Sequence, residues 1–271
     1  MVVRALAVML VVLSLGTVRA DPSERTDRDR IWHVAPFAAG GAFYLVLEFG
    51  LKEAVTPDHC RWCRSNRFDN ALRTSLKWAD VERADMLSNL TGYAGAPVYA
   101  IGMLLASSAG DLGIDRRRWY DDTIPILQAG IVTGVLNQAT KLVFVRRRPF
   151  AEFKGTSVQG HHDVNTSFFS GHTALAFAMS ASAGTVAHLR GYRSEAAIWI
   201  GGGLLAVTTG YLRIASDAHY ATDVIAGALI GSAIGISIPL LFHKDVLTDE
   251  APVARTRRGD TFMVSLGSWR F

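Results

Sequence analysis

Six apolar stretches of 19 to 23 residues constrain this chain of 271 residues more than any other feature. An α-helix rises about 1.5 Å per residue, so about 20 apolar residues are needed to cross the roughly 30 Å of hydrocarbon in a bilayer. We therefore predict an all-α fold, a membrane-embedded bundle of six helices; a soluble helical protein that buries these helices is the alternative. The predicted spans are residues 31–51, 91–110, 123–145, 171–189, 196–214 and 224–242.

The composition supports a membrane protein and excludes two other classes of protein. Apolar residues make up 49% of the chain and charged residues only 19%, which excludes a disordered chain. The mean hydropathy of +0.20 lies above that of most soluble proteins. The net charge of +4 is small and spread along the chain, so we expect membrane lipids and no nucleic acid as partners.

Small residues recur within the predicted spans. Gly227, Gly231 and Gly235 sit four residues apart, so they lie along one face of a helix. Such a stripe lets the backbone of a second helix approach closely. We therefore expect the sixth span to pack tightly against another helix.

The two ends of the chain lie outside the six spans. Residues 1–20 combine a basic start, twelve apolar residues and a small-x-small pattern at residues 18–20, which is typical of a cleaved secretory signal peptide. A first membrane anchor that stays attached is the alternative, although twelve apolar residues are short for a span. Residues 21–250 then form one predicted domain, and residues 251–271 form a short C-terminal tail with an extended segment.

Cys60 and Cys63 stand in the longest connection between spans, residues 52–90. A structural zinc site needs four ligands, and the chain has only two cysteines, so we expect no bound metal here. In an oxidising compartment the pair predicts a small local disulfide, with unpaired thiols as the alternative.

Cations gather where the third predicted span ends. Lys141 and Arg148 are seven residues apart, which is two helical turns, so they are predicted to share one helix face before Pro149 stops the helix. Alone, such a cluster is explained by the last helix carbonyls and the membrane interface.

The fourth span opens with Ser170, Gly171 and His172. A helix N-terminus offers free backbone N–H groups to an anion, and a glycine permits close approach. An imidazole one residue further on can give a proton to a leaving oxygen, although a lone histidine is more often a hydrogen-bonded structural residue.

The third group, Arg213, His219 and Asp223, bridges the fifth and sixth spans. His219 and Asp223 are four residues apart, so the carboxylate can orient one ring nitrogen and leave the other free as a nucleophile. The alternative for Asp223 is an acid that stabilises the first turn of a helix. Because consecutive spans alternate in direction, all three groups meet at one rim of the membrane, and their charges suit a phosphate.

Together, the patterns K-x6-RP, SGH and R-x5-H-x3-D resemble the three-part signature of the type 2 phosphatidic acid phosphatase and vanadium haloperoxidase superfamily. With six spans, the chain is similar to the membrane lipid phosphatase branch, which implies that branch's bundle. Phe169 and Leu212 depart from the usual pattern, which has Pro at the first position and often Ser at the second. The missing hydroxyl at Leu212 predicts a less firmly held Arg213.

The resemblance implies a role for each matching residue. It implies that His219 attacks phosphorus, that Asp223 orients His219, and that His172 protonates the departing alcohol, without a metal or other cofactor. The implied phosphate-binding residues are Lys141, Arg148, Ser170, Gly171 and Arg213.

We therefore expect a phosphatase that hydrolyses a lipid phosphate monoester or pyrophosphate through a phosphohistidine. A phosphate held at the membrane rim suits a lipid whose tails stay in the bilayer, and phosphatidic acid, phosphatidylglycerol phosphate, an isoprenyl pyrophosphate and a lipid A phosphate all fit. A soluble secreted acid phosphatase of the same superfamily is the first alternative, and a vanadium haloperoxidase ranks last. The oligomeric state stays open.

The side of the membrane that the site faces is a further expectation. Counting spans from a cleaved signal peptide places the site in the cytoplasm, and the basic residues of 52–90 favour the same side. Pro36 and Glu48 interrupt the first span, however, and a first span that does not cross restores an outward-facing site. By resemblance we expect a multi-pass inner-membrane protein with a periplasmic site, with a secreted periplasmic protein as the alternative.

Overall fold

The computed structural model describes residues 56–154 and 163–249, together with residues 35, 37–44, 46, 50 and 54. The predicted signal peptide and C-terminal tail lie outside the described residues, and the first predicted span lies within them only in part, with residues 37–44 helical. The described elements are α4 (Arg67–Leu76), α5 (Val81–Asn89), η3 (Leu90–Gly95), α6 (Ala96–Leu112), α7 (Arg116–Phe144), α8 (Pro149–Lys154), α9 (Gly171–Arg190), α10 (Glu195–Ala215), α11 (Ala221–Ile238), η5 (Pro239–His243) and α12 (Lys244–Asp249). Over this part of the chain no β-strand forms, which confirms the predicted all-α bundle.

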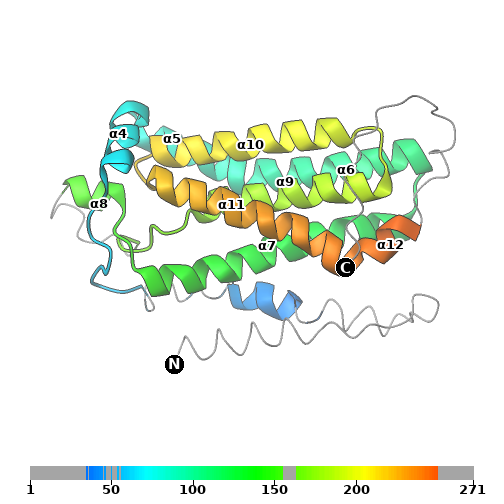
Figure 1. Cartoon of the computed structure of the whole chain (residues 1–271), viewed down its shortest axis with the longest axis horizontal. Helices are drawn as coiled ribbons and strands as arrows, with labels where there is room; N and C mark the ends of the chain where they lie inside the picture. Colours follow the sequence, from blue (N-terminus) through cyan, green and yellow to red (C-terminus); the bar gives the residue numbers. More distant parts are fainter. Residues whose placement is uncertain are drawn as a thin grey trace, which may run out of the picture.

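Helix α9 is the central helix of the bundle. It packs against α6, α7, α10 and α11, and Figure 1 shows these long helices running side by side. Its buried residues are mostly Ala, Ser, Thr and Gly. Because these side chains are small, the neighbouring helices approach closely.

The predicted glycine stripe on α11 lies against α9. A Cβ added at Gly227 would come within 2.7 Å of the carbonyl oxygen of Ser170, and a Cβ at Gly231 or Gly235 would collide with α9 carbonyl oxygens one and two turns further on. Only glycine therefore permits this contact, and the tight packing predicted for the sixth span is confirmed.

Three helical stretches are long and apolar enough to cross a membrane, namely Val81–Leu112, Glu195–Ala215 and Ala221–Thr248. Their outward-facing side chains include Val98, Ile200, Leu204, Val207 and Leu229, each more than half exposed. Helices α7 and α9 were also predicted to be spans, but they do not reach the same hydropathy among the described residues. Their polar and small side chains face other helices and the pocket described below.

A buried ion pair ties α7 to α9 near the C-terminal end of α9. Nε of Arg190 donates to a carboxylate oxygen of Asp122 at 2.7 Å, and the hydroxyl of Tyr192 donates to the other oxygen at 2.5 Å. Arg190 and Asp122 are both fully buried. This cluster stabilises the packing of α7 against the C-terminal end of α9.

Candidate active site

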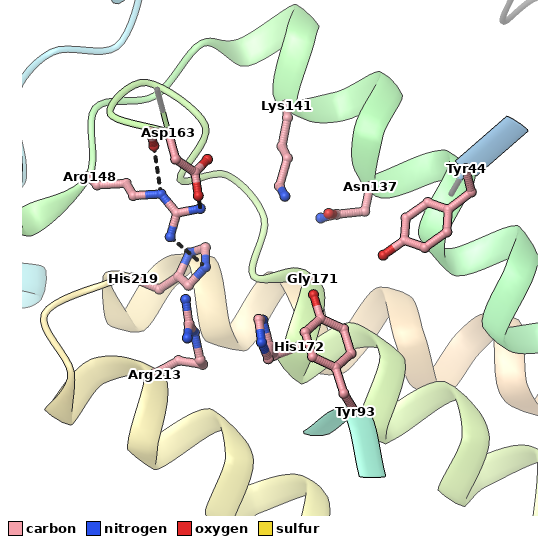
Figure 2. A pocket seen from close by; sticks show the side chains of 10 residues that line it. All are labelled: Tyr44, Tyr93, Asn137, Lys141, Arg148, Asp163, Gly171, His172, Arg213 and His219. Carbon is pink, nitrogen blue, oxygen red and sulfur yellow. Dashed lines mark hydrogen bonds and ion pairs between the residues drawn. The ribbon is translucent and has the colours of Figure 1, made fainter. Parts of the chain in front are cut away.

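A pocket lies where α7 and α10 end and where α9 and α11 begin. Figure 2 shows the side chains that converge on it. The structure therefore brings together residues from all three motifs. The lining residues are Tyr44, Tyr93, Asn137, Lys141, Arg148, Asp163, Gly171, His172, Arg213 and His219.

The end of α7 differs from the prediction. The helix ends at Phe144, because Val145 adopts a left-handed conformation with φ 46°, so Lys141 and Arg148 are not two turns apart on one helix. Pro149 begins the short helix α8 instead of stopping α7. Both cations still reach the pocket, because the chain turns after Val145.

Arg148 is buried and lies beside His219. Its Nη1 is 3.4 Å from Nε2 of His219, while Nε and Nη2 donate to the carbonyl and the carboxylate of Asp163 at 2.8 and 2.7 Å (Figure 2). Asp163 thus occupies two of the donors that we expected to bind phosphate.

His219 has one ring nitrogen fixed and one directed at the pocket cations. Its Nδ1 donates to the carbonyl oxygen of Ser167 at 2.8 Å, which leaves Nε2 without a proton on the side of Arg148. Burial, followed by the cations Arg148, Arg213 and Lys141, holds the pKa of His219 well below its usual value. The imidazole is therefore neutral near pH 7, as a nucleophile must be.

His172 and Gly171 form the first turn of α9. Nε2 of His172 lies 2.6 Å from the side-chain oxygen of Asn89, and its ring lies 4.1 Å from the ring of Tyr93. A Cβ at Gly171 would approach the side-chain oxygen of Asn137 to 2.7 Å, so glycine leaves room for this side chain of α7 beside the start of α9.

Arg213 is held from helix α5. Its Nη1 donates to Asp85 at 2.5 Å and to the hydroxyl of Ser88 at 2.9 Å. These two residues supply the support that we expected to be missing because position 212 is Leu.

One comparison with known proteins, a family model, covers this part of the chain. The family model described as the PAP2 superfamily matches residues 123–246, which include all three motifs. Over these residues the chain is similar to the PAP2 superfamily. Among solved structures, it is similar to the first transmembrane PAP2 type phosphatidylglycerolphosphate phosphatase from Bacillus subtilis, at 18% identity and a TM-score of 0.47, covering 77% of this chain and 96% of that one. A search of curated proteins gives no match.

Two residues of the PAP2 signature lie outside the pocket lining. The hydroxyl of Ser170 is buried and bonds to the hydroxyl of Thr173 at 2.9 Å, so it does not line the pocket. The carboxylate of Asp223 is 3.7 Å from Nδ1 of His219, which is too far for the hydrogen bond that we expected. Asp223 instead accepts from the hydroxyl of Ser167 at 2.5 Å, so it holds the residue that orients His219.

Sequence reasoning missed several residues around the PAP2 motifs. Asn137 precedes Lys141 by four residues, so their shared helix face was a usable signal. Asp85 and Asn89 lie on α5, far before Lys141 in the sequence, and belong to none of the three motifs. They were therefore accessible only from the tertiary structure.

Cys60 and Cys63 form a disulfide, as the sequence predicted for an oxidising compartment. The loop that they close packs against the end of α7. The backbone N–H of Arg61 donates to the carbonyl of Val145 at 3.0 Å, and the N–H of Arg147 donates to the carbonyl of Trp62 at 2.9 Å. The disulfide loop thus supports the turn that carries Arg148 into the pocket. Within the described parts of the chain, no three His, Cys, Asp or Glu side chains gather as a metal site.

Proposed function

We propose that this protein is a phosphatase that hydrolyses a lipid phosphate monoester or pyrophosphate through a phosphohistidine at His219. The observation that carries the proposal is the hydrogen bond from Nδ1 of His219 to the carbonyl of Ser167. This bond leaves Nε2 free to attack in a pocket that Lys141, Arg148 and Arg213 line. The apolar surface of the neighbouring helices supports a substrate whose tails stay in the membrane.

The proposed first step transfers the phosphoryl group to the enzyme. Nε2 of His219 attacks phosphorus, the bond from phosphorus to the alcohol oxygen breaks, and His172 gives a proton to that oxygen. The cations and the N–H of Gly171 balance the negative charge on the phosphoryl oxygens.

In the second step water attacks the phosphohistidine. His172, now without its proton, takes a proton from the water as the new bond to phosphorus forms. The bond from phosphorus to Nε2 of His219 breaks, and inorganic phosphate leaves. We propose that this sequence needs no metal, because side chains and backbone N–H groups supply the charge neutralisation.

The Cys60–Cys63 disulfide supports a site that faces the periplasm. Disulfides persist in oxidising compartments and are rare in the cytosol. The disulfide loop is hydrogen-bonded to the end of α7, so it lies on the same side of the membrane as the pocket. We give this observation more weight than the basic residues of the same connection, because the positive-inside rule is statistical.

Phosphate release in detergent tests the function. We expect the wild type to hydrolyse phosphatidic acid or phosphatidylglycerol phosphate in the presence of EDTA, and His219→Ala to lose this activity while it folds normally. A preference for a soluble monoester would favour the secreted acid phosphatase. Loss of activity with EDTA would contradict metal independence.

The side of the membrane that the pocket faces needs a separate experiment. Gly191 follows the last residue of α9, so its loop lies at the end opposite to the pocket. Alkaline phosphatase fused after Gly191 should be inactive if this loop is cytoplasmic and the pocket is periplasmic. An active fusion would place the pocket in the cytoplasm.

A further inference from the structure

Arg146 is a fully buried cation that does not line the pocket. Its Nη1 donates to Asp223 at 2.5 Å, and its Nη2 donates to Asp69 at 2.6 Å. The rings of Trp62 and Tyr220 lie 3.8 and 4.4 Å from its guanidinium carbon. A guanidinium satisfies two carboxylates and two rings at once, which an ammonium group cannot do with the same geometry.

Arg146 reaches Ser167 by two routes. Its backbone carbonyl accepts from the N–H of Ser167 at 3.0 Å. Its side chain holds Asp223, whose other oxygen accepts from the hydroxyl of Ser167 at 2.5 Å. The carbonyl of this same Ser167 accepts from Nδ1 of His219. The orientation of the His219 ring therefore depends on a residue that Arg146 fixes on two sides.

Asp69 extends this arrangement to the start of α11. Its Oδ1 accepts from the backbone N–H of Thr222 at 2.9 Å, and its Oδ2 accepts from the Thr222 hydroxyl at 2.8 Å. Asp69 lies on α4 and is fully buried. The guanidinium of Arg146 thus connects the turn after α7 to Asp69 on α4 and to Asp223 in the first turn of α11.

We propose that Arg146, together with Asp69, is a positioning residue that sets the orientation and tautomer of His219 through Ser167 and Asp223. This inference rests on the proposed function for its effect on rate. It assigns no contact with substrate to Arg146. A ring displaced by about 1 Å is expected to lower the rate of attack roughly 100-fold.

The test compares Arg146→Met with the isosteric variant Asp69→Asn. The matched control is Arg190→Met, which removes an equally buried arginine from its carboxylate at the other end of α9. We expect Arg146→Met to lower kcat roughly 10- to 100-fold with little change in KM, and Arg190→Met to lower Tm while kcat per folded enzyme stays at the wild-type value.

The pH dependence of kcat separates positioning from mere folding. Removing the cation leaves Asp223 and Asp69 without the positive charge that they share, so the acid limb should move to higher pH in Arg146→Met and to lower pH in Asp69→Asn. The charged and titratable groups that face His219 stay unchanged in both variants; they are Lys141, Arg148, His172, Arg213 and Asp223.

A spectroscopic readout decides the proposal even without activity. The 15N spectrum of labelled histidine, with His219 assigned from a His219→Gln variant, should report a protonated Nδ1 in the wild type and in Arg190→Met, and a changed signal in Arg146→Met and Asp69→Asn. Identical His219 signals in all four proteins would overturn the proposal. A wild type that releases no phosphate would overturn only the proposed function.

Discussion

The side-chain oxygen of Asn89 lies 2.6 Å from Nε2 of His172, so a residue outside the three motifs holds the candidate general acid. The amide nitrogen of Asn89 donates to Asp85 at 3.0 Å, and Asp85 pairs with Arg213. Helix α5 therefore links His172, the proposed proton donor, to Arg213, a proposed phosphate-binding residue.

Asn89→Ala should lower kcat for a lipid phosphate about 10-fold, because the ring of His172 loses its hydrogen bond to Asn89 while the residues that line the pocket stay unchanged. A good leaving group needs little protonation, so p-nitrophenyl phosphate should be affected much less. Parallel assays of the two substrates check this, and Asn89→Gln, which keeps both the acceptor and the amide donor, should restore part of the rate. Equal losses on both substrates would show that Asn89 does not act through the proton transfer.

Asp163→Asn should lower KM about 5-fold and leave kcat nearly unchanged. The carboxylate of Asp163 competes with phosphate for Arg148, and a partly exposed ion pair of this kind contributes on the order of 1 kcal/mol. Asp111→Asn is a matched control, because Asp111 pairs with Arg193 at the other end of the bundle. An unchanged or higher KM in Asp163→Asn would mean that this carboxylate does not compete with substrate.

The rate of phosphate release should stay high as the pH is lowered through 6.5. Burial and neighbouring cations lower the pKa of His219, so its Nε2 stays unprotonated there and is lost as a nucleophile only when the pH falls below this lowered pKa. A profile of kcat against pH measures the position of this acid limb. A midpoint at or above pH 6.5 would contradict the assignment of His219 as the group that must be neutral.

Vanadate should inhibit phosphate release, because it resembles the phosphoryl group in the transition state and suits the same three cations. The measurement is phosphate release with and without vanadate, together with halide oxidation by peroxide. Bromination that depends on peroxide and vanadate, without phosphate release in the absence of vanadate, would favour a haloperoxidase.

The sequence predicted the meeting of the three motifs because alternating helices must bring those particular helix ends to one rim. It predicted the α9 contact of Gly227, Gly231 and Gly235 for an equally simple reason, since a four-residue spacing follows one helix face. Both predictions depend only on helix periodicity and chain direction, which local residue patterns encode.

The details that failed depend on tertiary contacts. Helix α7 ends where Val145 takes a left-handed conformation, which a valine rarely adopts. The carbonyl oxygen of Val145 accepts a hydrogen bond from the backbone N–H of Arg61, which lies in the disulfide loop. The i, i+4 spacing placed Asp223 near His219 correctly, but it carried no information about Ser167, which lies 52 residues away in sequence and takes the hydrogen bond.

The glycine stripe of α11, made of Gly227, Gly231 and Gly235, fixes the position of α11 relative to α9. Since α9 carbonyls lie where side chains of α11 would stand, the two helices cannot slide past each other without collision. His172 is the second residue of α9 and His219 stands two residues before α11, so this packing fixes the backbone positions of the two proposed catalytic residues relative to each other. Room for a bulky headgroup then depends on the rest of the pocket, where Asp163 is 31% exposed and Arg213 is held by Asp85, which is 47% exposed. Variation there is expected to change which substrates enter while the bond-breaking chemistry stays the same.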